Sequence, residues 1–257
     1  MKKIIKELLL VEIAQLNHDT FKLVLESDEC LPEIIPGQFV NIDVNKSKET
    51  FLRRPFSILD VDSSNRRISL LIKILGRASR VLTTYQVGDK ISVVFPLGNG
   101  FTLPKDKDVI LLIGGGSGVA PMLNLAKKCN LPRQQVHLLL GARSKKDHID
   151  SSWYNQFGTI YQTTEDGSLG DKGYVTDHSI FAKNLSNFDK IYTCGPKAMM
   201  QAICAKSKDA AIFCEASLEN MMACGFGVCL CCVEKTTLGN RCVCSEGPIF
   251  NVNELTW

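Results

Sequence analysis

The stretch VILLIGGGSG at residues 109–118 sets the fold class of this chain. Its apolar half, Val109 to Ile113, predicts a strand buried on both faces, because no polar residue alternates with the apolar ones. A glycine-rich turn follows, and residues 119–128 can form a helix after it. This order places free backbone amides and a helix dipole at the turn, where a pyrophosphate can bind. We therefore expect a nucleotide site here.

The glycine pattern departs from the dinucleotide-binding motif G-x-G-x-x-G, since Pro121 stands at the third small position. We do not assign a standard Rossmann loop, and a tight turn that only packs the strand against the helix is the alternative. The candidate contacts with a nucleotide are Gly115, Gly116, Ser117 and Gly118.

Strands and helices continue to alternate after this turn. Residues 135–140, 159–162 and 190–194 predict strands, and residues 196–206 predict a helix with proline in its first turn. This alternation is typical of a parallel α/β sheet, in which ligands collect at the carboxyl ends of the strands. Cys194, Gly195 and Pro196 follow such an end and are further candidates.

The sequence before residue 102 has a different pattern, which predicts short strands separated by turn residues. Strands are predicted from the first residues onward and at residues 21–26, 38–44, 68–75 and 91–95. Their near-regular spacing indicates a closed or sandwiched all-β unit. A polar stretch at residues 104–108 is the expected linker to the α/β region.

Two segments of the β unit have the chemistry of a flavin site. In the first, Arg54 can bind a pyrophosphate with its guanidinium, and the ring of Phe56, which follows Pro55, can pack on the flavin or ribose. Ser57 can hydrogen-bond the isoalloxazine. A turn with a surface arginine is the alternative. The second segment runs from a strand into a glycine-containing turn and a helix start suited to phosphate; its candidates are Leu71, Ile72, Lys73, Ala78 and Ser79.

Cysteines crowd the C-terminal end of the chain. Eight of the eleven lie between Cys204 and Cys244. An odd total without a secretory signal argues against a disulfide framework and for metal ligation in a reducing compartment, so we expect a cytoplasmic protein. Cys224, Cys229 and Cys232 have the C-x4-C-x2-C spacing of plant-type ferredoxins, which bind a 2Fe–2S cluster, and the fourth ligand is Cys242 or Cys244. A structural zinc site and inert buried cysteines are the alternatives.

The overall composition excludes two classes of partner. The 257 residues carry 30 basic and 27 acidic side chains, a formal net charge of +3, which gives no basis for nucleic-acid binding. No apolar run approaches the roughly 18 residues of a membrane-spanning helix. We therefore expect neither nucleic acid nor membrane as a partner.

These motifs in this order resemble the ferredoxin–NADP reductase superfamily and, more closely, the electron transfer subunits of type B dihydroorotate dehydrogenases. The resemblance spans essentially the whole chain. It is carried by the sequences PGQF at 36–39, RRPFS at 53–57, GGGSGVAP at 114–121, CGP at 194–196, CGFGVCLCC at 224–232 and CSEGP at 244–248.

The resemblance implies an N-terminal FAD-binding antiparallel β-barrel (1–101), an NAD-binding α/β domain (102–213) and a 2Fe–2S module (214–257). It selects Cys244 over Cys242 as the fourth ligand. FAD would be held by the segment 54–57, by residues 71–73 and by the pair Ala78–Ser79, which stands where relatives have Gly-Thr. No catalytic acid or base is expected on this chain.

The resemblance also implies a partner. Dihydroorotate would be oxidised on the FMN of a separate catalytic subunit, in a heterotetramer of two copies of each subunit. Electrons would pass through the cluster and FAD to NAD+, in pyrimidine biosynthesis. The alternatives are a small subunit of another NAD(P)H-linked oxidoreductase, of the ferredoxin, sulfide or hydrogenase type, and a zinc-binding interaction protein.

Overall fold

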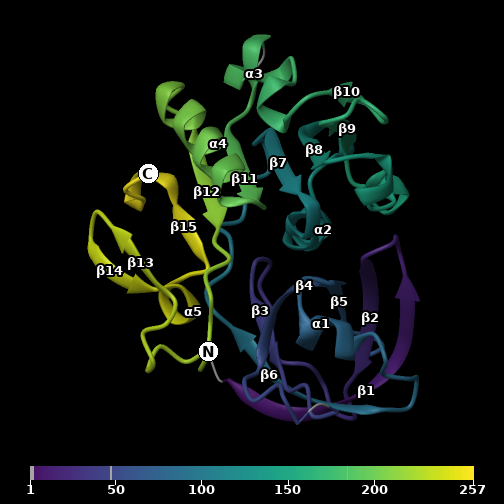
Figure 1. The fold of residues 1–257 in the computed structure, drawn as a ribbon. Helices are drawn as coiled ribbons and strands as arrows, with labels where there is room; N and C mark the ends of the chain where they lie inside the picture. Colours follow the sequence, from purple (N-terminus) through teal and green to yellow (C-terminus); the bar gives the residue numbers. More distant parts are fainter. Residues whose placement is uncertain (1–2, 47, 184) are drawn as a thin grey trace.

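The computed structural model describes residues 3–46, 48–183 and 185–257, and its N-terminal part is a closed six-stranded barrel (Figure 1). Neighbouring strands are antiparallel, in the order β1-β2-β5-β4-β3-β6, and β1 closes the barrel by pairing with both β2 and β6. The predicted barrel is thus confirmed. Its strands are β1 (Ile4–Gln15), β2 (Thr20–Glu26), β3 (Phe39–Ile42), β4 (Arg54–Asp62), β5 (Arg67–Lys73) and β6 (Lys90–Leu97).

Alternating side chains fill the barrel. Leu8 and Leu10 of β1 and Val40 and Ile42 of β3 are fully buried and belong to one apolar cluster inside it. The residues between them face outward, where Leu9 is exposed and Asn41 is covered by other parts of the chain. The short helix α1 (Arg77–Leu82) follows β5 and contributes Leu82 to the same cluster.

The second part is a seven-stranded sheet in the order β10-β9-β8-β7-β11-β12-β15. All its pairs are parallel except the last, in which β15 runs antiparallel to β12. The strand predicted at residues 190–194 and the helix predicted at residues 119–128 are observed with the same bounds as in the prediction. The strands are β7 (Ile110–Gly115), β8 (Val136–Ala142), β9 (Thr159–Thr164), β10 (Asp171–Lys172), β11 (Lys190–Cys194), β12 (Phe213–Ser217) and β15 (Ile249–Asn251).

Helix α2 (Val119–Lys128) lies between this sheet and the barrel, as Figure 1 shows. Eight of its ten residues are buried, because one face packs on β7 and the other on β4. Lys127 at its end pairs with Asp60 of β4 across 2.8 Å. Helix α4 (Lys197–Asp209) covers β11 and β12, and the short α3 (Ile180–Lys183) precedes β11.

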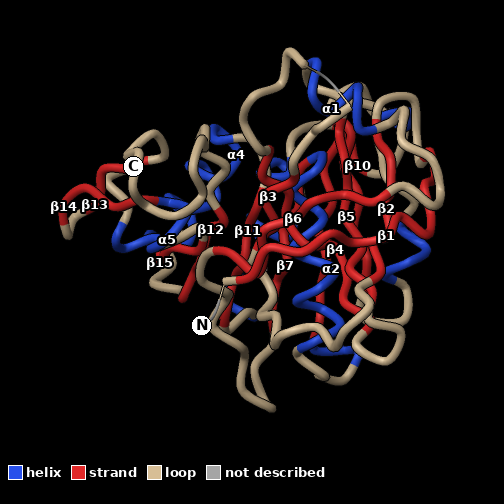
Figure 2. The backbone as a smooth tube through the Cα atoms, turned by 90° about the horizontal axis from the view of Figure 1, so that it is seen from below, coloured by secondary structure: helices blue, strands red, loops and turns tan. Residues whose placement is uncertain are grey.

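The C-terminal segment leaves the sheet and returns to it. After β12, a loop leads to the hairpin of β13 (Val233–Thr236) and β14 (Gly239–Cys242), then to the helical turn α5 (Val243–Glu246). Strand β15 then pairs with β12. Figures 1 and 2 both place the hairpin at the periphery, beyond α5 and β15.

The helices of the described residues are too short or too polar for any of them to cross a bilayer.

Candidate functional site

An open cleft of about 780 Å³ lies between the barrel and the sheet. Strands β4 and β5 present Pro55, Phe56 and Ser57, and Leu71 and Lys73, on its barrel side. The rest of its wall comes from the barrel, the glycine-rich turn and the C-terminal segment: Phe39, Leu75, Ser117, Ala120, Leu218, Glu219, Asn220, Met222 and Pro248. Apolar walls with a few polar groups suit a flat aromatic ring system such as a flavin.

Four predicted flavin residues are not among the described residues that line this cleft. Ile72 and Ala78 are buried in the barrel cluster, and Arg54 Nη1 donates hydrogen bonds to the carbonyls of Leu52 and Arg53, at 2.6 and 3.3 Å. The Ser79 hydroxyl accepts from the N–H groups of Leu75 and Gly76, at 3.0 and 3.1 Å. It thus fixes the start of α1. Side chains alternate along β5, so Ile72 points into the barrel while its neighbours on both sides face the cleft.

A second cleft, of about 1140 Å³, opens at the carboxyl ends of β7, β8 and β9. The predicted residues Gly115, Gly116 and Pro196 line it. Most of the remaining wall comes from separate loops of the chain, in which Asp147, Tyr174 and Met199 have no local pattern in the sequence. These further lining residues include Arg143, Asp147, Thr163, Glu165, Tyr174 and Met199.

The glycine-rich turn serves packing as well as the clefts. A Cβ at Gly118 would lie 2.2 Å from the carbonyl oxygen of Cys194, so only glycine fits where the turn meets β11. Gly195 has a φ of +151° and packs on Met199, where a Cβ would lie 2.7 Å from Cε. Gly118 therefore fits the interpretation as a packing turn. Gly115 and Gly116 line the second cleft and Ser117 lines the first, as the interpretation as a nucleotide site requires.

Lys73 is shared by the two clefts. Its Nζ lies 3.5 Å from a carboxylate oxygen of Asp19, and a Cβ at Gly116 would lie 3.9 Å from the same Nζ. The ammonium group is therefore held over the glycine-rich turn. A cation in this position complements the phosphate groups of a dinucleotide.

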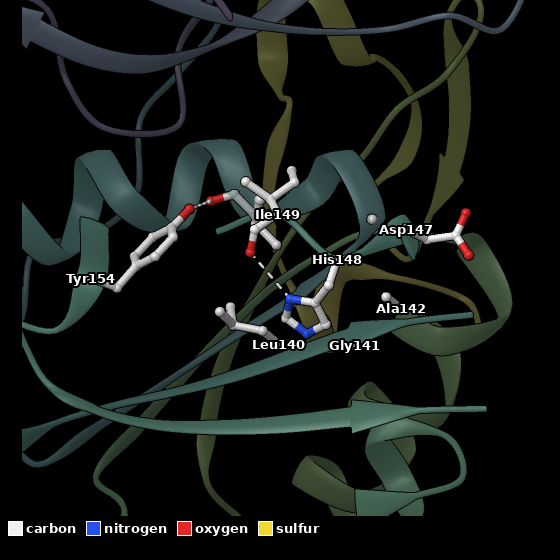
Figure 3. A pocket seen from close by; sticks show the side chains of 9 residues that line it. Leu140, Gly141, Ala142, Asp147, His148, Ile149 and Tyr154 are labelled. Atoms are coloured by element: carbon white, nitrogen blue, oxygen red, sulfur yellow. Dashed lines mark hydrogen bonds between the residues drawn. The ribbon is translucent and has the colours of Figure 1, made fainter. Parts of the chain in front are cut away.

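Behind the turn lies a small pocket of about 230 Å³, shown in Figure 3. The Tyr154 hydroxyl donates a hydrogen bond to the carbonyl of Val119 at 3.1 Å and so anchors the first residue of α2. Complete burial raises the pKa of Tyr154. His148 Nδ1 lies 3.2 Å from the carbonyl oxygen of Ile149, and its Nε2 is buried without a partner among the described residues. Gly116, Gly141, Ala142 and Asp147 line both this pocket and the second cleft, so the pocket adjoins that cleft at the turn.

Cys194 and Glu219 connect the sheet to the first cleft. The Cys194 thiol lies 3.8 Å from a carboxylate oxygen of Glu219, and burial together with the Glu219 charge raises the pKa of Cys194. Glu219 lies two residues after the end of β12, and its side chain is exposed at the cleft. Sequence reasoning missed Glu219, since a single acid after a strand has no recognisable pattern. The pair places a neutral thiol beside the cleft.

Cys224, Cys229 and Cys232 lie in the loop between β12 and β13, and Cys244 lies on α5. The loop bends sharply at Gly225 and Gly227, which have φ values of +77° and +83°. These bends aim backbone amides at the sulfur atoms. The N–H of Phe226 donates to Cys224 Sγ at 3.3 Å, and the N–H of Cys244 donates to Cys232 Sγ at 3.4 Å.

The loop amides decide the charge state of its first thiol. Burial raises the pKa of Cys224, but hydrogen bonds from the backbones of Phe226 and Cys229 outweigh it and lower this pKa to about 6. Burial and the neighbouring Cys232 raise the pKa of Cys244 to about 12. A thiol with Cys224's pKa is a thiolate at neutral pH, the form that ligates iron.

A barrel with a flavin-type cleft, a nucleotide cleft beside it and a cysteine loop at its edge define an iron–sulfur flavoprotein oxidoreductase. Three family models match the chain in this order. An oxidoreductase FAD-binding domain matches residues 7–101 and an oxidoreductase NAD-binding domain matches residues 112–205. The iron–sulfur cluster binding domain of dihydroorotate dehydrogenase B matches residues 219–256. The third match favours an iron–sulfur cluster over the zinc alternative.

The whole chain is similar to a single kind of subunit. It is 33% identical to the dihydroorotate dehydrogenase B (NAD(+)) electron transfer subunit of Shouchella clausii, over 99% of both chains. It is 36% identical to the subunit of the same name from Fusobacterium nucleatum, over 95% of both. The chain belongs to the family of dihydroorotate dehydrogenase B electron transfer subunits.

Solved structures share the fold. The chain superimposes on a chain from the structure of an NADH-dependent reduced ferredoxin–NADP oxidoreductase, with a TM-score of 0.85 and 28% identity, over 97% of this chain and 90% of that one. A ferredoxin reductase in carbazole 1,9a-dioxygenase gives a TM-score of 0.71 at 22% identity, over 82% of this chain and 67% of that one. The expected fold class is confirmed.

Proposed function

We propose that this chain takes electrons from a separate FMN-containing subunit that oxidises dihydroorotate and passes them through a 2Fe–2S cluster and FAD to NAD+. This step would serve pyrimidine biosynthesis. The name of the relatives in Shouchella clausii and Fusobacterium nucleatum supports the proposal. The two subunits would form a heterotetramer with two copies of each, in the cytoplasm.

One observation carries this proposal: the three sites open on one another. Glu219, Asn220 and Met222 precede the first cluster cysteine and also line the flavin-type cleft. Lys73 lines both that cleft and the nucleotide cleft. Electrons can therefore move between neighbouring groups without a large displacement of the chain.

The proposed ligands keep the division into a flavin barrel (1–101), a nucleotide domain (102–213) and a cluster module (214–257). Cys224, Cys229, Cys232 and Cys244 would hold the cluster. FAD would lie against Pro55, Phe56, Ser57, Leu71 and Lys73, with Arg54, Ile72, Ala78 and Ser79 supporting the backbone around it. NAD would lie against Gly115, Gly116 and Pro196, with Ser117, Gly118, Cys194 and Gly195 shaping the turn.

The chain's own residues would bind and orient these groups. FAD, when bound, exchanges the single electrons of a cluster for the two-electron chemistry of a nicotinamide. Lys73 would neutralise phosphate charge, and Ser57 would hydrogen-bond the flavin. The Cys194 thiol stays protonated because burial raises its pKa. It would therefore place a neutral, polarisable group at the meeting point of the two rings.

Two charged residues in the nucleotide cleft support NAD over NADP. Arg143 Nη2 lies 3.2 Å from Asp147 Oδ1, so its charge is already paired. Glu165 follows β9 and lines the same cleft. A carboxylate suits a free ribose hydroxyl and repels a 2'-phosphate.

The cluster loop offers an apolar surface to the partner. The side chains of Phe226, Val228 and Leu230 are 40%, 78% and 64% exposed. Exposed apolar residues gathered in one loop mark an interaction site, and electrons must enter there. We place the partner subunit on this surface.

Reconstitution tests the proposal. The chain, purified anaerobically with FAD and cluster, should reduce NAD+ with dihydroorotate only when the FMN subunit is added. Failure of the reconstituted pair to reduce NAD+ would overturn it. Reduction of NAD+ by reduced ferredoxin alone would instead favour a ferredoxin-linked oxidoreductase, the activity named for the structural relative.

A further inference from the structure

Asn41 is a buried amide without a hydrogen-bond partner. It lies in β3 and is 0% exposed, and neither its Nδ2 nor its Oδ1 has a partner among the described residues. Buried polar groups are nearly always paired, so an orphan of this kind points to a group that binds beside it. The neighbouring β3 residues Val40 and Ile42 face the barrel core, and Asn41 therefore faces away from that core.

The side chain of Asn41 meets the cluster loop. A Cβ at Gly225 would lie 2.9 Å from Asn41 Nδ2, so the amide packs on the residue that follows Cys224. Gly225 has a φ of +77°, and a side chain there would collide with the amide. The loop is thus built to approach Asn41 closely.

Asn41 also adjoins the flavin-type cleft. Its strand partner on β4 is Pro55, which lines that cleft, and Phe39 lines it two residues earlier on β3. The amide therefore lies between the cleft and the first cysteine of the loop. Any electron that passes between the two sites crosses this region.

We propose that Asn41 is a positioning residue whose Nδ2–H donates a hydrogen bond to a sulfur atom of the cluster on its flavin side. The inference rests on the proposed cluster ligands. A donor of this kind stabilises the reduced cluster, which carries one more negative charge, and so raises its reduction potential. It thus favours the uptake of electrons by the cluster from the partner subunit.

The first test compares two apolar substitutions in the cluster-loaded, FAD-loaded protein. Asn41→Leu removes the donor at similar volume, and the equilibrium constant for electron transfer from FAD to the cluster should fall by about tenfold. That factor is about 59 mV for one electron. Asn124→Leu is the matched control, because Asn124 in α2 is also buried with an unpartnered Nδ2. Its cluster potential should equal that of the unchanged protein.

The second test needs no substitution. Protein labelled with 15N only in asparagine is reduced, and pulsed electron paramagnetic resonance should show a 15N coupling to the cluster. Absence of this coupling, or an unchanged potential in Asn41→Leu, overturns the inference. A shift of the FAD potential with the cluster potential unchanged does the same. If the unchanged protein assembles no 2Fe–2S cluster at all, the proposed function falls together with it.

Discussion

The backbone N–H of Gly227 donates a hydrogen bond to the Sγ of Cys244 across 3.1 Å, although the residues are 17 positions apart in sequence. An N–H donor stabilises a thiolate. Cys242 has the opposite relationship to the same glycine, since its thiol points at the carbonyl oxygen of Gly227 at 3.9 Å. Gly227 therefore turns its N–H toward Cys244 and its carbonyl toward Cys242.

Substitution of Cys244 should abolish the cluster. Cys244→Ser removes a soft thiolate ligand, and we expect loss of the visible absorption of the cluster with FAD retained. Cys242→Ser should keep the cluster and its iron content. Iron and sulfide analysis of the two anaerobically purified variants checks this, and the reverse result would reassign the fourth ligand to Cys242.

Loss of the charge on Lys73 should weaken cofactor binding. Lys73→Met keeps an unbranched side chain up to the ε position but removes the ammonium group over Gly116. A charge-assisted contact contributes about 1.5–3 kcal/mol, so the dissociation constant for FAD or NAD should rise at least tenfold. Fluorescence titration of each cofactor measures the change. Equal affinities for both cofactors in the variant and the unchanged protein would remove Lys73 from the binding site.

Charge reversal at Glu165 should shift the nucleotide preference. Glu165→Lys replaces a carboxylate at the end of β9 with a cation that can pair with a 2'-phosphate. The ratio of kcat/KM for NADH to that for NADPH should fall by about tenfold or more. Glu165→Gln, which removes the charge without reversing it, should give an intermediate ratio. Steady-state reduction of a dye by each nucleotide provides the measurement.

Glu215 should make stability depend on pH. It joins the sheet to the segment after the barrel, since its carboxylate accepts from the N–H and hydroxyl of Thr102 at 2.9 and 2.7 Å. Burial outweighs these bonds and raises its pKa above the usual 4.5. A raised folded-state pKa contributes stability that is complete below the unfolded-state pKa and is lost as the pH rises through the folded-state value.

The Tm of the unchanged protein minus that of Glu215→Gln should therefore decrease as the pH rises from about 4 to about 7. A loss of about 1 kcal/mol corresponds to about 2–4 °C. Thermal denaturation followed by circular dichroism measures it. A difference that increases with pH would mean that the ionised carboxylate is the form the fold favours.

A charge on the exposed cluster loop should block the partner. Val228→Lys places an ammonium group on a side chain that is 78% exposed, where we place the interface. The dissociation constant of the two subunits should rise at least tenfold, because an unpaired charge would be buried. Size-exclusion chromatography and calorimetry measure this, with an unchanged cluster spectrum as the control. Normal assembly would move the interface elsewhere.

Elements with strong local signals could be predicted from the sequence. The apolar run before Gly114 and the helix after Gly118 appear as expected, since both are decided by local hydrophobicity and turn chemistry. The cysteine spacing predicted an iron–sulfur site correctly because this signal is also local: three of the proposed ligands lie within one loop.

Contacts between distant segments could not be predicted. Asn41 and Glu219 have no local pattern, and each acquires its place only when the barrel, the sheet and the C-terminal segment pack together. Strand β15 is another case, because its three residues are too few for a periodic signal. The side chain of Ile72 lies in the barrel cluster, because alternation along β5 turns it inward.

Strand β15 also protects the edge of the sheet at β12. It contributes only Ile249–Asn251, yet it covers the edge of β12 by antiparallel pairing. These residues leave the ribosome after the whole cysteine loop, so the edge of β12 stays open until that loop has been synthesised. An uncovered edge recruits other strands and promotes aggregation. A chain truncated before residue 249 would leave the edge of β12 exposed and would aggregate. The chains that stay in solution are therefore those that contain the whole cysteine loop.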